Sequence, residues 1–393
     1  MAAAAKKDKA ENGDQVIDAT IGCCLYDEEG RFVALHSVFD HYDALDHQIK
    51  GAYAASFSGN ANFRKDVYEW ITRGTGLQLP HSVIATPGGS GAVSAAFDSF
   101  LDEGDTVLIP DIGWTSYQLM AEHFNRHFRF YPMFDGDHFH LDGIKQCLKE
   151  IAETQERIVL VINDPCHNPT GYSLSIPEWQ ELIRLVNEAA EKKPAILIND
   201  IAYLDYAFDQ EHCRDYMKTF EQISENVMIV TAFSCSKAMT AYGLRCGAAV
   251  VFARKEDDVR EASVVIDKFA RGIWSNIPNA AMENFCWVIE ENREAYLAEK
   301  QACIDLLKAR SDVFLQEAKE CGLKLYPYRE GFFATVICPK ERIDAVHKAL
   351  MEQHVYTVCV AEGIRVALCS LPLRKTNSLR VVNRKCTNEE CTL

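Results

Sequence analysis

The segment SCSKAMTAYGLRCG, residues 234–247, places reactive side chains directly after an apolar run. The run is VMIVTAF, and Ser234 follows it, then Lys237 and, eight residues later, Arg245. A lysine amine held in a pocket can attack a carbonyl carbon. A hydroxyl and a guanidinium can bind an anion through charge-assisted hydrogen bonds. The spacing therefore predicts a reactive amine beside an anion site.

Other polar groups also follow apolar runs. Asp200 ends PAILIND, with Tyr203 three residues later, and Asn168 lies in the turn PCHNPTG after RIVLVIND. SVIATP leads into GGSGAVSAAF, where the backbone amides of Gly89 and Ser90 would be free at the start of a helix. Free amides and the helix dipole both favour an anion at that point. A carboxylate, a phenol, a side-chain amide and an anion-binding helix start thus follow apolar runs in the same way as the lysine.

The elements that must position these groups form an α/β pattern. The apolar runs between about residues 80 and 253 are rich in Val and Ile and barely alternate, as strands buried on both faces do. Amphipathic segments such as SIPEWQELIRLVNEAAEKK lie between them, with Ser175 and Pro177 placed to start a helix. A doubly wound sheet collects its ligands beyond the carboxyl ends of its strands. We therefore expect the polar groups to meet there.

The pattern changes after WSNIPN. Helical periodicity runs from about Ala280 to Cys321, and Gly322 is placed to end it. FFATVICP, RIDAVHKALMEQH and GIRVALCSLP then predict strand, helix and strand, an α+β unit of its own. We expect an N-terminal arm with part of the small domain over 1–44, a large domain over 45–285 and a small domain over 286–393. The first 14 residues are predicted to be a disordered tail.

Composition excludes several classes of function. The chain of 393 residues has 41 basic and 57 acidic residues, a formal charge of −16, which disfavours nucleic acid as a partner. No run approaches the roughly 18 apolar residues of a membrane span, and the start lacks a signal peptide's apolar core. The 15 cysteines are scattered without a CxxC pair, which predicts reduced thiols and no metal site. These features together predict a cytoplasmic protein.

The polar constellation matches the needs of pyridoxal 5′-phosphate. Lys237 would form a Schiff base with the cofactor aldehyde, and Asp200 would keep the pyridine nitrogen protonated so that the ring accepts electrons. A phenol and an amide would hydrogen-bond the 3-oxygen of the ring. Ser234 and Arg245 would hold the phosphate.

Nearly the whole chain, from IGCCLYDEEGRFVAL to GIRVALCSLP, then resembles a known family. TPGGSGA, HNPTG, NDIAY, SCSKAMTAYGLRCG and GIRVALCSLP are similar to motifs of the fold type I, class I aminotransferases of the aspartate/aromatic amino-acid type. The resemblance implies a three-layer α/β/α large domain with a mostly parallel sheet and a smaller α+β domain. It also implies a homodimer with active sites at the interface.

The resemblance assigns roles residue by residue. Lys237, Asp200 and Tyr203 would be catalytic, and the freed Lys237 amine would also move the substrate α-proton. Trp114 would stack on the ring, and Arg365 would bind the substrate α-carboxylate with help from the backbone near Gly22. The remaining implied contacts are Tyr203 and Asn168 to the 3-oxygen, Gly89, Ser90, Ser234 and Arg245 to the phosphate, Tyr53 to the partner's phosphate, and Arg271 to a distal carboxylate across the interface.

Three departures from the family pattern bear on these roles. Trp274 stands near Arg271 where dicarboxylate-binding relatives carry tyrosine, and a surface arginine at the end of a helix remains the alternative for Arg271. The stretch AYAASFSGNANF is one residue longer between Tyr53 and its glycine. Tyr117 occupies the place of a histidine behind the acid that pairs with the ring.

We therefore expect an aminotransferase that moves the amino group of aspartate or an aromatic amino acid to 2-oxoglutarate by a ping-pong mechanism. A lyase of the β-elimination type with the same cofactor stays open. An NAD-binding oxidoreductase is the weaker alternative, because Gly89, Gly91 and Ser94 with Asp111 only approximate a dinucleotide motif. A regulator on the same fold would need an N-terminal DNA-binding module, which about 20 polar residues cannot form.

Overall fold

A seven-stranded sheet forms the centre of the larger part of the molecule. The computed structural model describes residues 1–376. The strand order is β2-β10-β9-β8-β7-β3-β4; only β10 runs against its neighbours, and the other pairs are parallel. The strands are β2 (His81–Thr86), β10 (Gly247–Phe252), β9 (Val227–Ser234), β8 (Ala195–Asp200), β7 (Ile158–Asn163), β3 (Thr106–Pro110) and β4 (His127–Tyr131).

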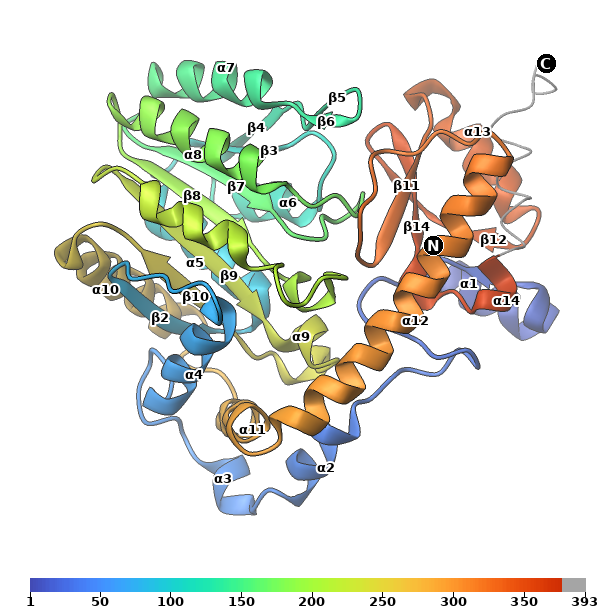
Figure 1. Cartoon of the computed structure of the whole chain (residues 1–393), viewed down its shortest axis with the longest axis horizontal. Helices are drawn as coiled ribbons and strands as arrows, with labels where there is room; N and C mark the ends of the chain where they lie inside the picture. The colour runs from blue at the N-terminus through green and yellow to red at the C-terminus, as the bar shows by residue number, and fades with distance from the viewer. Residues whose placement is uncertain (377–393) are drawn as a thin grey trace.

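Helices cover both faces of this sheet (Figure 1). Each central strand is buried throughout, so alternate side chains enter two separate cores. Ile196 and Ile198 pack in one core and Leu197 packs in the other. The helices of this part are α4 (Ala61–Thr72), α5 (Gly88–Phe100), α6 (Ser116–His123), α7 (Leu141–Ala152), α8 (Ile176–Ala190), α9 (Cys235–Ala238), α10 (Glu256–Ile273) and α11 (Asn279–Glu290). The predicted three-layer α/β/α arrangement is confirmed.

The smaller part has its own sheets. β11 (Phe333–Ile337), β14 (Gly363–Ala367) and β13 (Val358–Val360) form an antiparallel sheet in the order β11-β14-β13. β1 (Ile17–Asp18) pairs in parallel with β12 (Val355–Tyr356), which brings the N-terminal arm onto this part. Its helices are α1 (Ala2–Asn12), α13 (Lys340–Met351) and α14 (Leu373–Thr376). The predicted α+β character is confirmed, while the proposed boundaries at 44/45 and 285/286 stay predictions.

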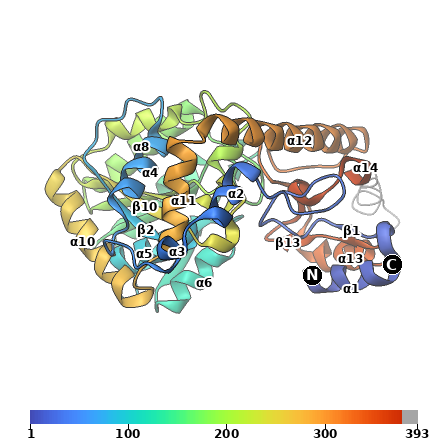
Figure 2. The same ribbon diagram turned by 90° about the horizontal axis from the view of Figure 1, so that it is seen from below.

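The long helix α12 (Arg293–Glu320) runs from the large part to the small part (Figure 2). The single helical run predicted over 280–321 is in fact α11 and α12, separated at Glu291 and Asn292. Gly322, with φ +70°, follows the end of α12 as predicted. The other elements within residues 1–376 are α2 (His36–Ala44), α3 (His47–Gly51), the hairpin strands β5 (Phe134–Asp135) and β6 (His138–Phe139), and several 3-10 helices.

The prediction of a disordered tail over the first 14 residues is wrong. Residues 2–12 form α1, and Ala5 is only 1% exposed because it packs beside Val16 and Tyr356. The Asp8 carboxylate accepts a hydrogen bond of 3.0 Å from the Tyr356 hydroxyl. An alanine-rich segment has high intrinsic helix propensity, and docking onto β12 adds the tertiary contacts that a short helix needs.

Among the described residues, no helix is both long enough and apolar enough to cross a bilayer.

Candidate active site

A cavity of about 220 Å³ opens at the carboxyl ends of the central strands. Eleven of the predicted site residues line it together, although they come from positions 22 to 365 of the chain. They are Gly22, Gly89, Ser90, Trp114, Asn168, Asp200, Tyr203, Ser234, Lys237, Arg245 and Arg365. The groups expected at strand ends thus line one cavity together with Gly22 and Arg365, while the role of each residue stays a prediction.

Lys237 reaches the cavity from the short helix α9, which starts where β9 ends. The Ser234 side chain caps this helix by accepting a hydrogen bond from the Ser236 amide at 3.2 Å. The amine Nζ lies 5.7 Å from the Tyr203 ring centroid and 5.0 Å from that of Tyr242. Burial lowers the pKa of Lys237 because desolvation disfavours the ammonium form. The amine is thus easier to deprotonate, which favours nucleophilic attack and proton transfer.

Asp200 lies at the end of β8 and is 4% exposed. The Tyr117 hydroxyl donates to Oδ2 at 2.7 Å, and the Ala202 amide donates to Oδ1 at 3.1 Å. Burial raises the pKa of Asp200, and these two hydrogen bonds oppose that rise by stabilising the carboxylate. A buried acid held in this way can pair with a protonated ring nitrogen.

The N-terminus of α5 provides an anion site. Gly88 has φ +74°, and a Cβ there would lie 2.7 Å from the Arg245 guanidinium, so only glycine allows this approach. Arg245 donates to the Pro87 carbonyl at 2.7 Å and to the Ser236 hydroxyl at 3.2 Å. The guanidinium is thereby held beside the first amides of the helix, a geometry suited to a phosphate.

Arg365 occupies the opposite side of the cavity, on β14. It donates to Asn168 Oδ1 at 3.2 Å and to the Thr20 carbonyl at 3.1 Å, and its Cζ lies 4.4 Å from the Phe333 ring centroid. Its Nε atom is buried and has no hydrogen-bond partner among the described residues. A Cβ on Gly22 would lie 2.4 Å from the Phe333 ring. The guanidinium donates to neutral oxygens of Asn168 and Thr20, so its charge can still pair with a carboxylate.

Three residues beside the cavity were missed from the sequence. Gly88 is the glycine that admits Arg245, and Tyr242 places its ring 4.8 Å from the Arg245 Cζ. Cys23 lines the cavity next to Gly22, and a hydrogen bond from the Cys24 thiol together with the Lys237 charge lowers the pKa of its thiol. Tyr242 lies inside the SCSKAMTAYGLRCG motif, so its spacing from Lys237 was a usable signal.

Two predicted residues lie outside this chain's cavity. Arg271 donates to the Tyr53 hydroxyl at 2.9 Å, and its Cζ lies 4.2 Å from the Phe57 ring centroid. Tyr53 is 61% exposed. The structure brings Tyr53 and Arg271 to each other rather than to Lys237.

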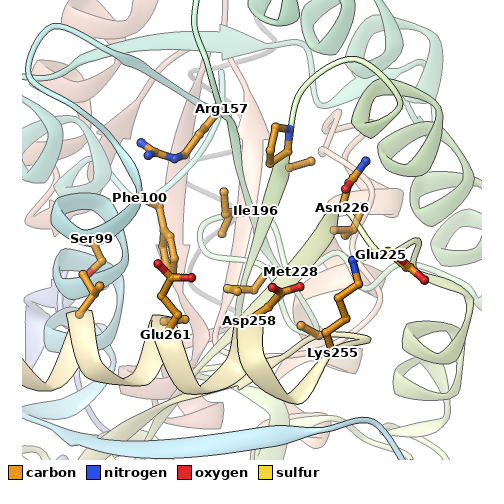
Figure 3. Close-up of a pocket in the computed structure, with 16 residues that line it drawn as sticks. Ser99, Phe100, Arg157, Ile196, Glu225, Asn226, Met228, Lys255, Asp258 and Glu261 are labelled. Atoms are coloured by element: carbon orange, nitrogen blue, oxygen red, sulfur yellow. Dashed lines mark ion pairs between the residues drawn. The ribbon is translucent and has the colours of Figure 1, made fainter.

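A larger cavity of about 400 Å³ lies at the amino ends of β8 and β9 (Figure 3). Its two basic side chains, Arg157 and Lys255, each pair with an acidic side chain. Lys255 pairs with Glu225 at 2.8 Å, and Arg157 pairs with Asp102 at 3.2 Å. The cavity lacks a buried acid beside an unpaired lysine, so size does not make it the active site.

The dinucleotide alternative finds no support in this geometry. Asp111 does not line the Lys237 cavity. Its carboxylate instead accepts hydrogen bonds from the backbone amides of Ile112 at 2.8 Å and Met133 at 3.1 Å. The acid therefore stabilises a local turn, and it is not placed to bind a ribose.

Comparison with known proteins identifies the family. A family model described as "Aminotransferase class I and II" matches residues 40–391. An aspartate aminotransferase of Escherichia coli is 26% identical over 196 residues, which are 49% of this chain and 48% of that enzyme. An aromatic-amino-acid aminotransferase of Pseudomonas aeruginosa is 25% identical over 195 residues, 49% of this chain and 47% of that enzyme. The chain thus spans about half the length of these curated relatives.

Solved structures match over a longer stretch. An aminotransferase from Anaerococcus prevotii has a TM-score of 0.95 and 35% identity, covering 98% of this chain and 95% of that one. An aromatic-amino-acid aminotransferase from Burkholderia pseudomallei, described as covalently bound to pyridoxal phosphate, has a TM-score of 0.81 and 19% identity. That match covers 98% of this chain and 96% of the other, and at this identity it shows the fold alone.

The residues of the cavity fit pyridoxal phosphate. The α5 N-terminus with Arg245 suits the phosphate, Asp200 suits the ring nitrogen, and Lys237 suits the aldehyde. The carboxylate of the buried Asp200 accepts hydrogen bonds from Tyr117 and Ala202, and a cationic ring nitrogen would add an opposite charge beside it. From these residues and from the match over 40–391, the chain belongs to the class I and II aminotransferase family, whose cofactor is pyridoxal phosphate.

Proposed function

We propose that this protein is a pyridoxal-phosphate-dependent aminotransferase that moves the amino group of aspartate, of aromatic amino acids or of both to 2-oxoglutarate in a ping-pong mechanism. The observation that carries the proposal is the convergence of Lys237, Asp200 and Arg365 on one cavity. Relatives named as aspartate and aromatic-amino-acid aminotransferases support the choice of donors.

Each residue has a distinct task in this mechanism. When bound, the cofactor supplies an aldehyde for the amino group and an electron-accepting ring. Arg365 binds the carboxylate of the amino acid and so orients its α-carbon. The Lys237 amine, whose pKa burial has lowered, accepts the proton from that α-carbon and later returns one. Asp200 would hold a proton on the ring nitrogen of the bound cofactor, and Tyr203 and Asn168 would hydrogen-bond its 3-oxygen.

The second half-reaction requires a pocket that also accepts a dicarboxylate. The cavity has one arginine, Arg365, positioned for an α-carboxylate, and we propose that Arg271 of the partner binds the distal carboxylate. The exposed position of Arg271 beside Tyr53 supports a role toward another subunit. A homodimer with shared active sites is therefore part of the proposal.

The lysine at position 237 provides the first test. Borohydride reduction of the cofactor-loaded protein, followed by peptide mapping, should place one pyridoxyl group on Lys237. Lys237→Ala should lose both this label and all measurable transamination, because the covalent link and the proton carrier are the same amine. Lys255→Ala, which removes a half-exposed lysine of the other cavity, should retain both. Transamination by the Lys237→Ala protein at an appreciable rate would refute the mechanism.

A panel of amino donors with 2-oxoglutarate tests the reaction type. Glutamate and a 2-oxo acid should appear in equal amounts, with aspartate or an aromatic amino acid giving the highest kcat/KM. Release of ammonia without glutamate would favour the β-elimination lyase instead.

A further inference from the structure

Lys300, on α12, is a buried lysine that contacts the backbone of the catalytic segment. It is 2% exposed, and its Nζ donates to the Ala238 carbonyl at 2.8 Å and to the Lys237 carbonyl at 3.4 Å. The Tyr296 hydroxyl, one turn earlier on α12, donates to the same Ala238 carbonyl at 2.8 Å. Two side chains of one helix thus hold the C-terminal end of α9, the helix that carries Lys237.

The environment of Lys300 explains what the ammonium does there. Nζ lies 3.2 Å from the centroid of the Tyr206 ring, a cation–π contact. Burial lowers the pKa of Lys300 to about 7, although the charge of Asp205 acts in the opposite direction. Burying an amine has a large desolvation cost, and an apolar side chain of similar volume would avoid it. The hydrogen bonds that Lys300 donates to the backbone of α9 offset part of that desolvation cost, and an apolar side chain could not form them.

The same helix is held firmly at other points. Glu299 accepts a hydrogen bond from the Ser37 amide at 2.9 Å. Arg310, fully buried, donates to Glu28 at 2.7 Å and to the Cys369 carbonyl at 3.1 Å. Cys369 follows β14, the strand that carries Arg365. Lys300 and Arg310 are ten residues apart, about 15 Å along a helix, so α12 connects the two sides of the cavity.

We propose that Lys300 and Tyr296 are positioning residues that anchor α9 to α12 and thereby hold the Lys237 amine in register with Arg365. This role rests on the proposed function of Lys237. Neither residue lines the cavity, so both act through the backbone of the catalytic segment. The anchor itself is a property of the polypeptide and can be measured without the cofactor.

The first measurement is hydrogen exchange of residues 235–246 in cofactor-free protein. Three variants are compared: Lys300→Met, Tyr296→Phe, and the control Lys308→Met, which alters an exposed lysine on the same helix. The Thr240 amide, which donates to the Lys237 carbonyl at 3.1 Å, should exchange roughly fivefold faster in the first two variants, as loss of one hydrogen bond predicts. The control should exchange as wild type.

The second measurement uses cofactor-loaded protein. In Lys300→Met, the midpoint of the absorbance titration of the cofactor bound at Lys237 should shift, and kcat should fall roughly tenfold while the amino-donor KM stays within about twofold. Lys308→Met should leave the midpoint and both constants unchanged. A purely structural loss of stability would move the melting temperature without moving the midpoint.

The outcomes separate this inference from the proposed function. Wild-type exchange and a wild-type titration midpoint in a folded Lys300→Met protein would overturn the anchor. If Lys300→Met does not fold, Tyr296→Phe decides, and wild-type exchange in that variant overturns it equally. Absence of a pyridoxyl label on Lys237 would instead refute the proposed function, while faster exchange in the cofactor-free variants would still support the anchor.

Discussion

The charge of Asp200 depends on its hydrogen bond from Tyr117. Both side chains are buried, and burial alone would favour the neutral acid. The phenol donates to the carboxylate at 2.7 Å and lowers its pKa. Tyr117 therefore helps to keep the Asp200 carboxylate negatively charged.

Removing that hydrogen bond should shift the acid limb of the pH profile. In Tyr117→Phe the pKa of Asp200 rises, so the carboxylate is protonated at a higher pH as the solution is acidified. The acid limb of kcat/KM should then lie at higher pH, with a loss of about 1.5–3 kcal/mol in transition-state stabilisation at neutral pH. Tyr131→Phe, which removes a buried phenol bonded to the Val161 carbonyl, is the matched control. An unmoved acid limb would contradict this role.

Cys23 is expected to be the most reactive thiol of the cavity. Its pKa lies below the ordinary value, because the Cys24 thiol donates to the thiolate and the Lys237 charge attracts it. The thiolate therefore persists at lower pH than in an ordinary cysteine. The rate of alkylation by iodoacetamide, followed by mass spectrometry as a function of pH, should have its midpoint for Cys23 below about pH 8.5, the ordinary pKa of a thiol.

Cys359 provides the comparison within the same protein. It is half-buried on β13, and burial raises the pKa of its thiol. Cys359 should be alkylated only at higher pH. Cys23→Ser should abolish the alkylation that is observed at lower pH. A Cys23 midpoint at or above that of Cys359 would show that the thiolate is not stabilised.

At the scale of elements, local capping sets where α8 begins. Ser175 accepts a hydrogen bond from the Glu178 amide at 3.4 Å, while the Glu178 carboxylate accepts one from the Ser175 amide at 2.7 Å. This reciprocal capping box satisfies two amides that the helix itself cannot. The capping residues are close in sequence, so the segment SIPEWQ by itself predicts that a helix starts there.

Loss of the cap should therefore destabilise the fold measurably. Ser175→Ala should lower the free energy of unfolding by about 1 kcal/mol in urea denaturation of the cofactor-free protein. Ser263→Ala, in the middle of α10, should change it by less than about 0.5 kcal/mol. Equal effects of the two substitutions would mean that the capping box adds nothing.

For the molecule as a whole, substitution of Arg271, which contacts Tyr53, tests whether two subunits share their active sites. Arg271→Leu should weaken the binding of dicarboxylate substrates by roughly 2–4 kcal/mol if Arg271 pairs with a buried distal carboxylate. An unchanged KM for aspartate would contradict that pairing. Sedimentation should show a dimer, as the shared-site proposal requires.

Mixed dimers would show from which subunit Arg271 acts. A dimer of one Lys237→Ala chain and one Arg271→Leu chain would contain a single site with both native residues, provided that Arg271 serves the partner. Random mixing should therefore restore roughly a quarter of the aspartate activity. The homodimer of each variant, carried through the same mixing procedure alone, is the control. No restoration in confirmed mixed dimers would place Arg271 outside the partner's site.

Six of the seven strands of the large sheet, and the polar groups that follow them, could be predicted from apolar runs in the sequence. Asp200, Lys237 and Asn168 lie at the ends of apolar runs, and parallel strands bring such ends to one edge. Periodicity, capping and turn residues are local signals, so they could be read without coordinates. The types and spacing of these groups predicted pyridoxal phosphate, and the family motifs added the aminotransferase reaction.

Contacts between residues far apart in the sequence become visible in the folded chain. Arg365 bonds Asn168 across 197 positions and Thr20 across 345, and Lys300 reaches the Ala238 carbonyl across 62. The helix α1, predicted to be a tail, is ordered by its docking onto β12. These contacts depend on how finished elements pack, because burial and side-chain reach are properties of the folded chain that no local pattern encodes.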